Sequence, residues 1–355
     1  MGARCLVAAV MGTERAPVCS AMRRVFAASL MLLAGCAPYP HVEKKGDYLE
    51  LHTRYESDLR ERTMFDDHAV PRDGHFLSAR SYGSENARQG PAIILMHGFP
   101  DNLHLYDLVA PQLAETRHVI AFDFLGWGHS DKPTNHVYST SSLIRDLDAV
   151  VAHFGLNQVV LVAHDASGPA AIDWALGHAE RVATLVLLNT FYGPMDTLYR
   201  PEAIELFSTP GMKSALRRFG ASISDSSWAS GYGEQITKFI GDEKQRDTFV
   251  PLLLAQSFDM RPAFFQLNKV LVQEVQQRVA HLPRLKAFQR PVRIIFGADD
   301  PYLNVGVARD FRALFPDSEL FIIESARHYV QIDQPERVVR LILSVPAGRE
   351  GAGCR

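Results

Sequence analysis

The chain has 355 residues, of which 47% are hydrophobic and 22% are charged, a balance typical of a folded globular protein and not of a disordered or fibrous one. Its formal net charge is −3, and no run of Lys and Arg suited to a phosphate backbone occurs, so we expect no nucleic-acid partner. The length permits two domains of about 150 residues each or one large α/β unit that carries an insertion.

The four cysteines lie outside the expected folded body: Cys5, Cys19 and Cys36 precede it, and Cys354 follows it. A disulfide, a thiolate nucleophile and a cysteine-based metal site are therefore not expected in the body. The sequence also lacks a His-Glu-x-x-His pattern. We expect a reaction that needs neither a metal nor a cofactor.

The amino terminus has the layout of a secretory signal. Two arginines follow Met22 and precede a short apolar run at 25–33, which is too short to cross a bilayer that needs about 20 residues. The next residues, Leu33-Ala34-Gly35-Cys36, resemble a bacterial lipobox, in which the cysteine is lipidated and becomes the mature amino terminus. An apolar leader with an incidental cysteine is the alternative.

This interpretation divides the first part of the chain into three segments. We predict a non-native extension at 1–21, a lipoprotein signal peptide at 22–35 and a tether at 36–61. Because Ala37 and not Asp follows the cysteine, the resemblance to lipoproteins favours the outer membrane. We therefore expect a protein of the bacterial cell envelope, held at the periplasmic face of the outer membrane by a lipid on Cys36.

From about residue 62, short apolar runs alternate with helical patterns. Apolar runs bounded by turn signals indicate strands that are buried on both faces. Their alternation with helices predicts a mostly parallel sheet covered by helices on both faces, with ligands beyond the carboxyl ends of the strands. The expected strands are 76–82, 92–96, 118–122, 159–163, 182–188, 292–296 and 319–323, and helical patterns include 142–154, 169–177 and 305–315.

The interval 191–288 breaks this alternation, because it is amphipathic and helical and is interrupted by proline and glycine. We interpret it as a helical cap inserted into a core formed by 62–190 and 289–344, with a tail at 345–355. A separate helical domain is the alternative. The strand expected at 292–296 directly after the interval favours the insertion.

Four motifs follow the expected strands in chain order, and together they resemble the α/β-hydrolase superfamily over about 62–344. Within it they resemble the branch of epoxide hydrolases and haloalkane dehalogenases. The resemblance implies an α/β-hydrolase fold with a mostly parallel central sheet and a cap. The motifs are His97-Gly98-Phe99-Pro100-Asp101, Asp123-x-x-Gly126-x-Gly128, Ala163-His164-Asp165-Ala166-Ser167-Gly168, and Gly297-x-x-Asp300 with His328.

The third motif matches the small-x-nucleophile-x-small turn between a strand and a helix, with Asp165 at the nucleophile position. A carboxylate with a reference pKa near ~3.9 is already ionised at neutral pH. Aspartate is therefore suited to displace a leaving group from a saturated carbon and to form an alkyl ester with it. A capping residue for the following helix is the structural alternative for Asp165.

The second chemical step would use a histidine and an acid. We expect His328 to deprotonate the water that hydrolyses the ester, and Asp300 to orient the imidazole. Asp299 is an adjacent rival, but the Gly-x-x-Asp spacing favours Asp300. The resemblance further implies that the backbone N–H groups of Phe99 and Ala166 hold the oxyanion.

The residues that would stabilise the leaving group are less clear in the sequence. Dehalogenases of this branch usually carry Trp after the nucleophile, where this chain has Ala166, whereas its His-Gly-Phe-Pro pattern is usual in epoxide hydrolases. Epoxide hydrolases usually also have two cap tyrosines, and the matching neighbourhoods here lack them. The possible donors are Tyr192, Tyr199, Trp228 and Tyr232.

These observations rank three hypotheses. Hydrolysis of an epoxide comes first, dehalogenation of a haloalkane second, and a membrane-tethered binding module of the same fold without catalysis third. The many phenylalanines of the cap indicate a hydrophobic small-molecule substrate, with water as the second reactant.

Overall fold

The computed structural model describes residues 44–208 and 211–344. The predicted extension 1–21, the signal peptide 22–35, Cys36 and the tail 345–355 lie outside the described residues. Within the described ranges, no helix is both long and apolar enough to cross a membrane.

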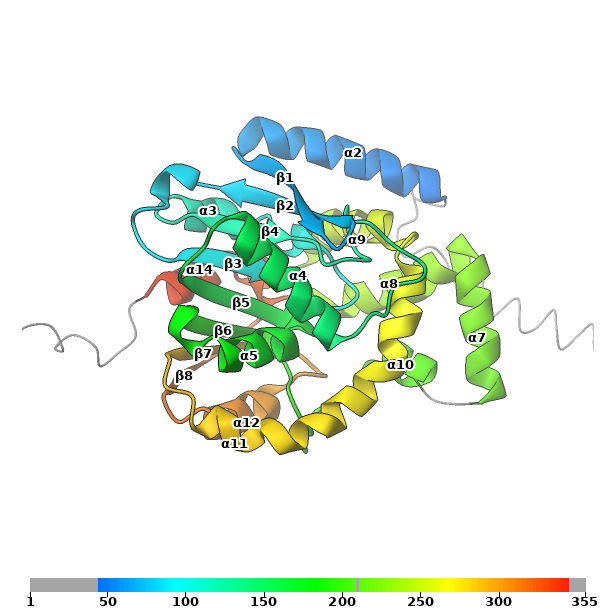
Figure 1. Ribbon diagram of the computed structural model, residues 1–355. Helices are drawn as coiled ribbons and strands as arrows, with labels where there is room; N and C mark the ends of the chain where they lie inside the picture. The colour runs from blue at the N-terminus through cyan, green and yellow to red at the C-terminus, as the bar shows by residue number, and fades with distance from the viewer. Residues whose placement is uncertain (1–43, 209–210, 345–355) are drawn as a thin grey trace, which may run out of the picture. The chain divides into compact units, whose positions relative to one another are not determined.

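An eight-stranded sheet forms the centre of the described unit, in the order β1-β2-β4-β3-β5-β6-β7-β8 (Figure 1). The pairs β1–β2 and β2–β4 are antiparallel and all the other pairs are parallel, which confirms the predicted α/β-hydrolase fold class. The strands are β1 (Asp66–Arg72), β2 (His75–Tyr82), β3 (Ala92–Met96), β4 (Val119–Phe122), β5 (Val159–Asp165), β6 (Val182–Thr190), β7 (Val292–Gly297) and β8 (Ser318–Ile323).

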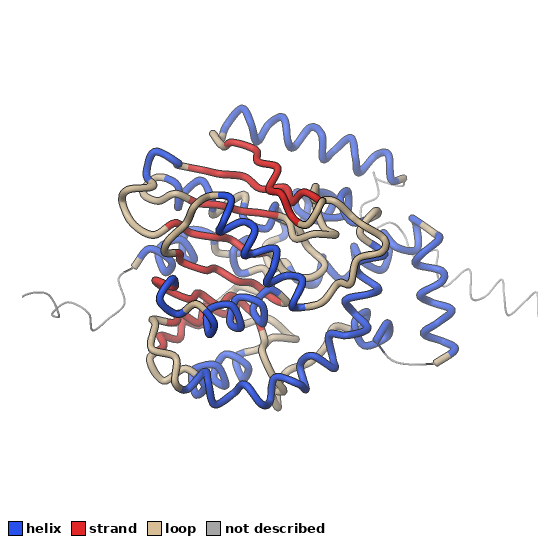
Figure 2. The backbone as a smooth tube through the Cα atoms, in the orientation of Figure 1, coloured by secondary structure: helices blue, strands red, loops and turns tan. Residues whose placement is uncertain are grey.

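Helices cover both faces of this sheet, and Figure 2 shows them on either side of the strands. The helices α4 and α5 pack against each other on one face, and α3 and α14 do so on the other. All residues of β3 and β4 are buried, as expected for central strands between two helical layers. The helices of the core are α3 (Ala110–Ala114), α4 (Thr140–His153), α5 (Ser167–Gly177), α12 (Val305–Leu314), α13 (Val330–Asp333) and α14 (Pro335–Leu343).

The cap is inserted between β6 and β7, as predicted, and the regular elements among its described residues are all helical. Its backbone is fastened to the core near the expected catalytic histidine. The N–H groups of Gly241 and Asp242 donate to Asp333 of α13, and the N–H of Tyr329 donates to the carbonyl of Phe239 at 3.1 Å. The cap helices are α6 (Glu202–Ser208), α7 (Met212–Ile223), α8 (Asp225–Phe239), α9 (Glu243–Ser257), α10 (Arg261–Gln277) and α11 (Leu282–Lys286).

The structure departs from the predicted tether at 36–61, because most of that segment forms the helix α2 (Lys45–Arg62). This helix packs against α9 of the cap. Tyr48, His52 and Leu59 are its buried residues, Leu51 and Tyr55 are partly buried, and most of its other positions are polar. So narrow an apolar stripe gives little periodic signal in the sequence. The folded body therefore begins before residue 62.

The edge strand β1 was also not predicted. Its sequence, Asp66–Arg72, is mostly polar and contains Pro71, which indicates a loop more than a strand. It pairs with β2 only, so one of its sides needs no ladder partner. An edge position tolerates polar residues and proline for this reason.

Candidate active site

Asp165 stands at a sharp turn between β5 and α5. Its φ of +48° lies in the left-handed region that residues with a side chain rarely adopt. The turn brings backbones so close that a Cβ on Gly168 would lie 1.8 Å from Thr190 Oγ1, and one on Gly98 would lie 2.8 Å from Asp165 Cβ. The Thr190 hydroxyl donates to the carbonyl oxygen of Asp165. The small residues of the motif are thus required by close packing around this turn.

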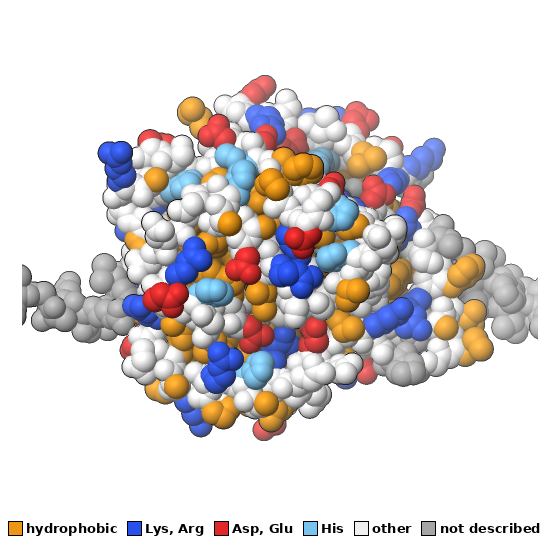
Figure 3. Space-filling model, in the orientation of Figure 1, with side chains coloured by type: hydrophobic (Ala, Val, Ile, Leu, Met, Phe, Trp, Pro, Cys, Tyr) orange, Lys and Arg blue, Asp and Glu red, His pale blue; other side chains and the backbone are white. Residues whose placement is uncertain are grey.

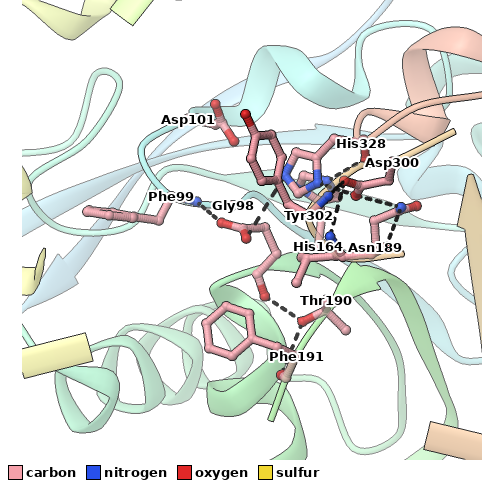
Figure 4. A network of polar contacts seen from close by, with 12 residues as sticks. Gly98, Phe99, Asp101, His164, Asn189, Thr190, Phe191, Asp300, Tyr302 and His328 are labelled. Carbon is pink, nitrogen blue, oxygen red and sulfur yellow. Dashed lines mark hydrogen bonds and ion pairs between the residues drawn. The ribbon is translucent and has the colours of Figure 1, made fainter. Parts of the chain in front are cut away.

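The carboxylate of Asp165 is held by backbone donors. Its Oδ2 accepts a hydrogen bond from the N–H of Phe99 at 2.9 Å (Figure 4). The N–H of Ala166 also donates to the carboxylate. Burial raises the pKa of Asp165, while the neighbouring His328 and the two N–H groups act in the opposite direction and favour the carboxylate. The two residues expected to form an oxyanion hole are therefore both in contact with the Asp165 side chain.

His328 lies between two carboxylates. Its Nδ1 is 2.8 Å from Asp300 Oδ2, and its Nε2 is 4.0 Å from Asp165 Oδ1. The first distance is a hydrogen bond, whereas the second is too long for one and leaves space beside Nε2. The structure thus brings together the three side chains that the sequence analysis selected, from the end of β5, the loop after β7 and the loop before α13.

Asp300 is buried and surrounded by donors. The N–H groups of Tyr302 and Leu303 donate to its Oδ1 at 2.9 and 3.1 Å, and Asn189 Nδ2 donates to its Oδ2 at 2.9 Å (Figure 4). Burial raises the pKa of Asp300, but His328 and these donors outweigh it and hold the pKa below its usual range. The adjacent Asp299 is exposed, so the structure, like the motif spacing, favours Asp300 over Asp299 as the acid that orients His328.

An apolar cavity of about 270 Å³ opens beside Asp165 and His328, which both line it. Apolar walls with few polar groups are typical of sites for hydrophobic small molecules. Its polar lining, besides those two residues, includes Tyr199, Arg200 and Tyr302. Apolar side chains from both core and cap form its walls, among them Phe99, Phe191, Met195, Leu198, Phe239 and Val275.

Of the four possible leaving-group donors, only Tyr199 lines this cavity. The hydroxyl of Tyr192 donates to Asp173, and that of Tyr232 donates to the carbonyl of Pro100 at 2.7 Å. The indole N–H of Trp228 donates to Ser257 Oγ at 2.8 Å. The sequence does not reveal these contacts, because the partners lie between 19 and 132 positions away in the chain.

The sequence analysis missed three buried residues that contact the site or its loop. Asn189 bridges Asp300 and the backbone of Gly297, and its place directly after the apolar run of β6 was the available signal. Tyr302 lines the cavity. Asp101 accepts from the Tyr329 hydroxyl at 2.6 Å, and burial raises the pKa of Asp101 to about 7.

Residues 91–335 match the family described as alpha/beta hydrolase fold, so the chain belongs to this family. Haloalkane dehalogenase 2 of Mycobacterium tuberculosis (strain ATCC 25618 / H37Rv) is 26% identical over 277 residues, which cover 72% of this chain and 87% of that protein. Cis-3-alkyl-4-alkyloxetan-2-one decarboxylase of Xanthomonas campestris pv. campestris is 26% identical over 281 residues, which cover 74% and 91%.

Two solved structures show the same fold at lower identity. A membrane phospholipase A, described as a bacterial virulence factor, aligns with a TM-score of 0.65 and 19% identity over 90% of this chain and 96% of that one. The epoxide hydrolase CorEH aligns with a TM-score of 0.61 and 20% identity over 78% and 96%. With the family match, these relatives support a hydrolase of the α/β fold.

The contact between His328 and Asp300 predicts the direction of a pH effect. Burial lowers the pKa of His328, but Asp300 and Asp165 outweigh it and raise the pKa above the ordinary value near ~6.5. In Asp300→Asn the nearest negative charge is lost, so the midpoint of His328 titration moves to lower pH. Histidine NMR titration of both proteins measures the shift. The exposed neighbour gives a control, since Asp299→Asn leaves the midpoint in place. Equal midpoints in Asp300→Asn and wild type would contradict the prediction.

Proposed function

We propose that this protein is a hydrolase that forms an alkyl ester on Asp165 and hydrolyses it with a water activated by His328. One observation carries the proposal. A carboxylate at the strand-to-helix turn has one oxygen held by the Phe99 N–H and the other 4.0 Å from His328 Nε2, and both side chains line an apolar cavity.

In the first step, Asp165 Oδ1 attacks a saturated carbon of the substrate. The bond between that carbon and its leaving atom breaks, and its electron pair goes to the leaving atom. Oδ2 already accepts from Phe99 N–H, so Oδ1 is the oxygen left to attack. Unlike a serine hydroxyl, an ionised carboxylate needs no base for this step, which leaves His328 available for the second step.

In the second step, a water beside His328 Nε2 loses a proton to that nitrogen and attacks the carboxyl carbon of the ester. The negative charge of the tetrahedral intermediate develops on Oδ2, where the N–H of Phe99 donates, and the N–H of Ala166 also donates to this carboxyl group. Asp300 stabilises the positive charge of the imidazole at Nδ1. Collapse breaks the bond to the alkyl oxygen, and the proton on Nε2 leaves with the product.

Tyr199 makes an apolar epoxide the favoured substrate. Opening an epoxide by carbon attack produces an alkoxide, a strong base that needs a proton donor. The tyrosines that line the cavity in the described part of the chain are Tyr199 and Tyr302. The Tyr302 hydroxyl already donates to Glu202 Oε2 at 2.8 Å, so Tyr199 is the proposed donor.

Release of a halide has less support in the structure. Ala166 offers no side-chain donor, and the indole N–H of Trp228 is bound to Ser257. No tryptophan lines the cavity within the described residues. The likeness to haloalkane dehalogenase 2 keeps this substrate class as the second hypothesis.

The small number of donors beside Asp165 favours a further candidate, the opening of an oxetan-2-one ring. Two relatives carry that ring in their names. Attack on the saturated ring carbon that carries the ring oxygen releases a carboxylate. The conjugate acid of this leaving group has a pKa near ~4, against about 15.7 for water. Such a leaving group needs no tyrosine, so a cavity with few donors suits it.

Trapping the ester tests the proposal and distinguishes the substrate classes. His328→Gln retains the nucleophile but lacks the base, so Asp165 should keep its adduct during incubation with apolar epoxides, haloalkanes and an oxetan-2-one. Intact mass spectrometry reads the result. An epoxide or a lactone adds its whole mass to Asp165, and a haloalkane adds its alkyl group without the halogen.

The control for trapping is His328→Gln combined with Asp165→Asn, which should gain no mass. If His328→Gln alone gains none with any of the three classes, the enzymatic proposal fails. The remaining hypothesis is then the binding module without catalysis.

The role of Tyr199 is tested by Tyr199→Phe. Loss of the proton donor should lower kcat on an apolar epoxide by about 100-fold or more, as removal of a general acid typically does. Tyr192→Phe is the matched control, because that hydroxyl is bound to Asp173 and does not line the cavity, so turnover should stay at the wild-type level. Equal activity of Tyr199→Phe and wild type would remove Tyr199 from the mechanism.

We also propose that the enzyme works at a membrane surface, anchored by a lipid on Cys36. The order of charge, apolar run and lipobox in 22–36 supports this anchor.

The cap helix α7 supports binding to a membrane surface separately. Met212, Leu216 and Phe219 are 75%, 63% and 63% exposed, and Lys213 and Arg217 are exposed on the same helix. Figure 3 shows apolar side chains over α7 at the right of the view. Exposed apolar and basic side chains together are typical of helices that lie on anionic membranes.

Cys36→Ser tests the anchor in a bacterial host. The wild type should incorporate radiolabelled palmitate and fractionate with membranes, while Cys36→Ser should lose the label because it has no thiol to acylate. Labelling of the variant at the wild-type level would contradict the proposed anchor. Fractionation of the unlabelled variant then shows how much of the membrane binding is due to α7.

A further inference from the structure

A cluster of ionisable side chains joins three elements away from the cavity. Helix α2 supplies His52 and Glu56, the short helix η2 (Leu103–Tyr106) supplies His104, and α9 supplies Gln256. Both histidines are buried and Glu56 is partly buried. None of these residues has a role in the mechanism above. We propose that His52, Glu56 and His104 bind one zinc ion, which fastens α2 to the core.

The three ligand atoms have the spacing of a metal site. His52 Nε2 and His104 Nε2 are 3.2 Å apart, and Glu56 Oε1 lies 3.0 Å from the second nitrogen and 3.8 Å from the first. A point about 2.0 Å from all three atoms exists inside this triangle, and zinc binds histidine nitrogen and carboxylate oxygen at about 2.0–2.2 Å. Without a metal, the facing ring nitrogens at 3.2 Å need a proton between them.

The surroundings of the triangle also suit a metal ion. His104 Nδ1 lies 2.6 Å from Asp107 Oδ2, the carboxylate–histidine contact that usually orients a ligating imidazole. The amide nitrogen of Gln256 lies 2.8 Å from His52 Nε2, and its Oε1 is buried without a hydrogen-bond partner among the described residues. Turning this amide would bring its oxygen to the cluster as a fourth ligand, a position that water can also fill.

The charges around the cluster are compatible with a dication. Glu56 and Asp107 carry negative charge, and Arg80 forms ion pairs with both. With neutral imidazoles, these three side chains sum to one negative charge, which a divalent ion would change to one positive charge. Histidine and carboxylate ligands suit zinc among the common divalent ions, whereas oxygen-only sites suit magnesium and calcium.

A metal here would connect the amino-terminal helix to the loop of the candidate active site. His104 lies in η2, which begins two residues after Asp101 in the His-Gly loop that carries Phe99. His52 and Glu56 are four positions apart, so they project from one face of α2 toward η2. The ion would therefore hold α2 in place and stabilise the core beside that loop. Such a role is structural, and it is independent of the proposed substrate.

Zinc binding to the full folded protein tests the proposal. After removal of metals with a chelator, the wild type should take up one zinc ion per chain in a calorimetric titration. Its Tm should rise by about 5 °C or more with excess zinc, since a ligand that binds only the folded state stabilises it. His52→Gln and Glu56→Gln should each lose the zinc uptake and the shift in Tm.

The control is His153→Gln, which removes a second pair of histidines with facing ring nitrogens. His153 Nε2 and His68 Nδ1 are 3.4 Å apart on the surface. This variant should bind zinc as the wild type does. Retention of the zinc-dependent shift in His52→Gln, or its loss in His153→Gln, would overturn the proposal. If the His52 and Glu56 variants do not fold, anomalous diffraction at the zinc edge from wild-type crystals decides, because the peak must lie about 2 Å from the three ligand atoms.

Discussion

The left-handed backbone at Asp165 is the constraint on which the candidate site depends. A residue with a side chain in this region costs about 1–3 kcal/mol, and it persists only where the surrounding structure fixes it. Here Gly98 and Gly168 allow the neighbouring segments to pack closely around the turn, and the Thr190 hydroxyl donates a hydrogen bond to the Asp165 carbonyl oxygen. In exchange, this backbone conformation places the Asp165 carboxylate beyond the sheet edge, where its Oδ2 accepts from the N–H of Phe99.

Burial of charge is the second cost of this arrangement. Two carboxylates flank one imidazole, and an unpaired buried charge would be strongly unfavourable. The structure offsets this cost with directed donors on Asp300 from Tyr302, Leu303 and Asn189. Backbone N–H groups are well suited to the task, because the fold holds them in place without side-chain entropy. The positions of the charged groups in the site thus depend on the backbone N–H groups of the surrounding loops as much as on the three functional side chains themselves.

The sequence predicted the sheet and the three central site residues because their signals are local. The apolar run of β3 is uninterrupted and the His97-Gly98 motif follows it directly, while Asp165 ends β5 and Asp300 comes three residues after β7. The helix α2 and the edge strand β1 were not predicted, since one has a narrow apolar stripe and the other is mostly polar. Hydrophobic periodicity has little to detect in either element.

The candidate donors illustrate a different limit. Tyr192, Trp228 and Tyr232 are aromatic residues of the cap, and nothing near them in sequence shows where the polar atom of each points. Their partners come from α5, α9 and the His-Gly loop, so the packing of cap helices on one another and on the core determines them. The same holds for His104, which meets His52 and Glu56 through the docking of α2.

The docking of α2 on α9 also restricts how the lid can move. Lys45 pairs with Asp259 at 2.8 Å, the Tyr48 ring lies 5.9 Å from that of Phe258, and Gln256 contacts His52, so the end of α9 is joined to the first helix of the body. A hinge that lifted the whole cap would break these contacts together. Movement of α6 and α7, whose main helix contacts in the described residues are with each other, α8 and α10, would leave these contacts intact.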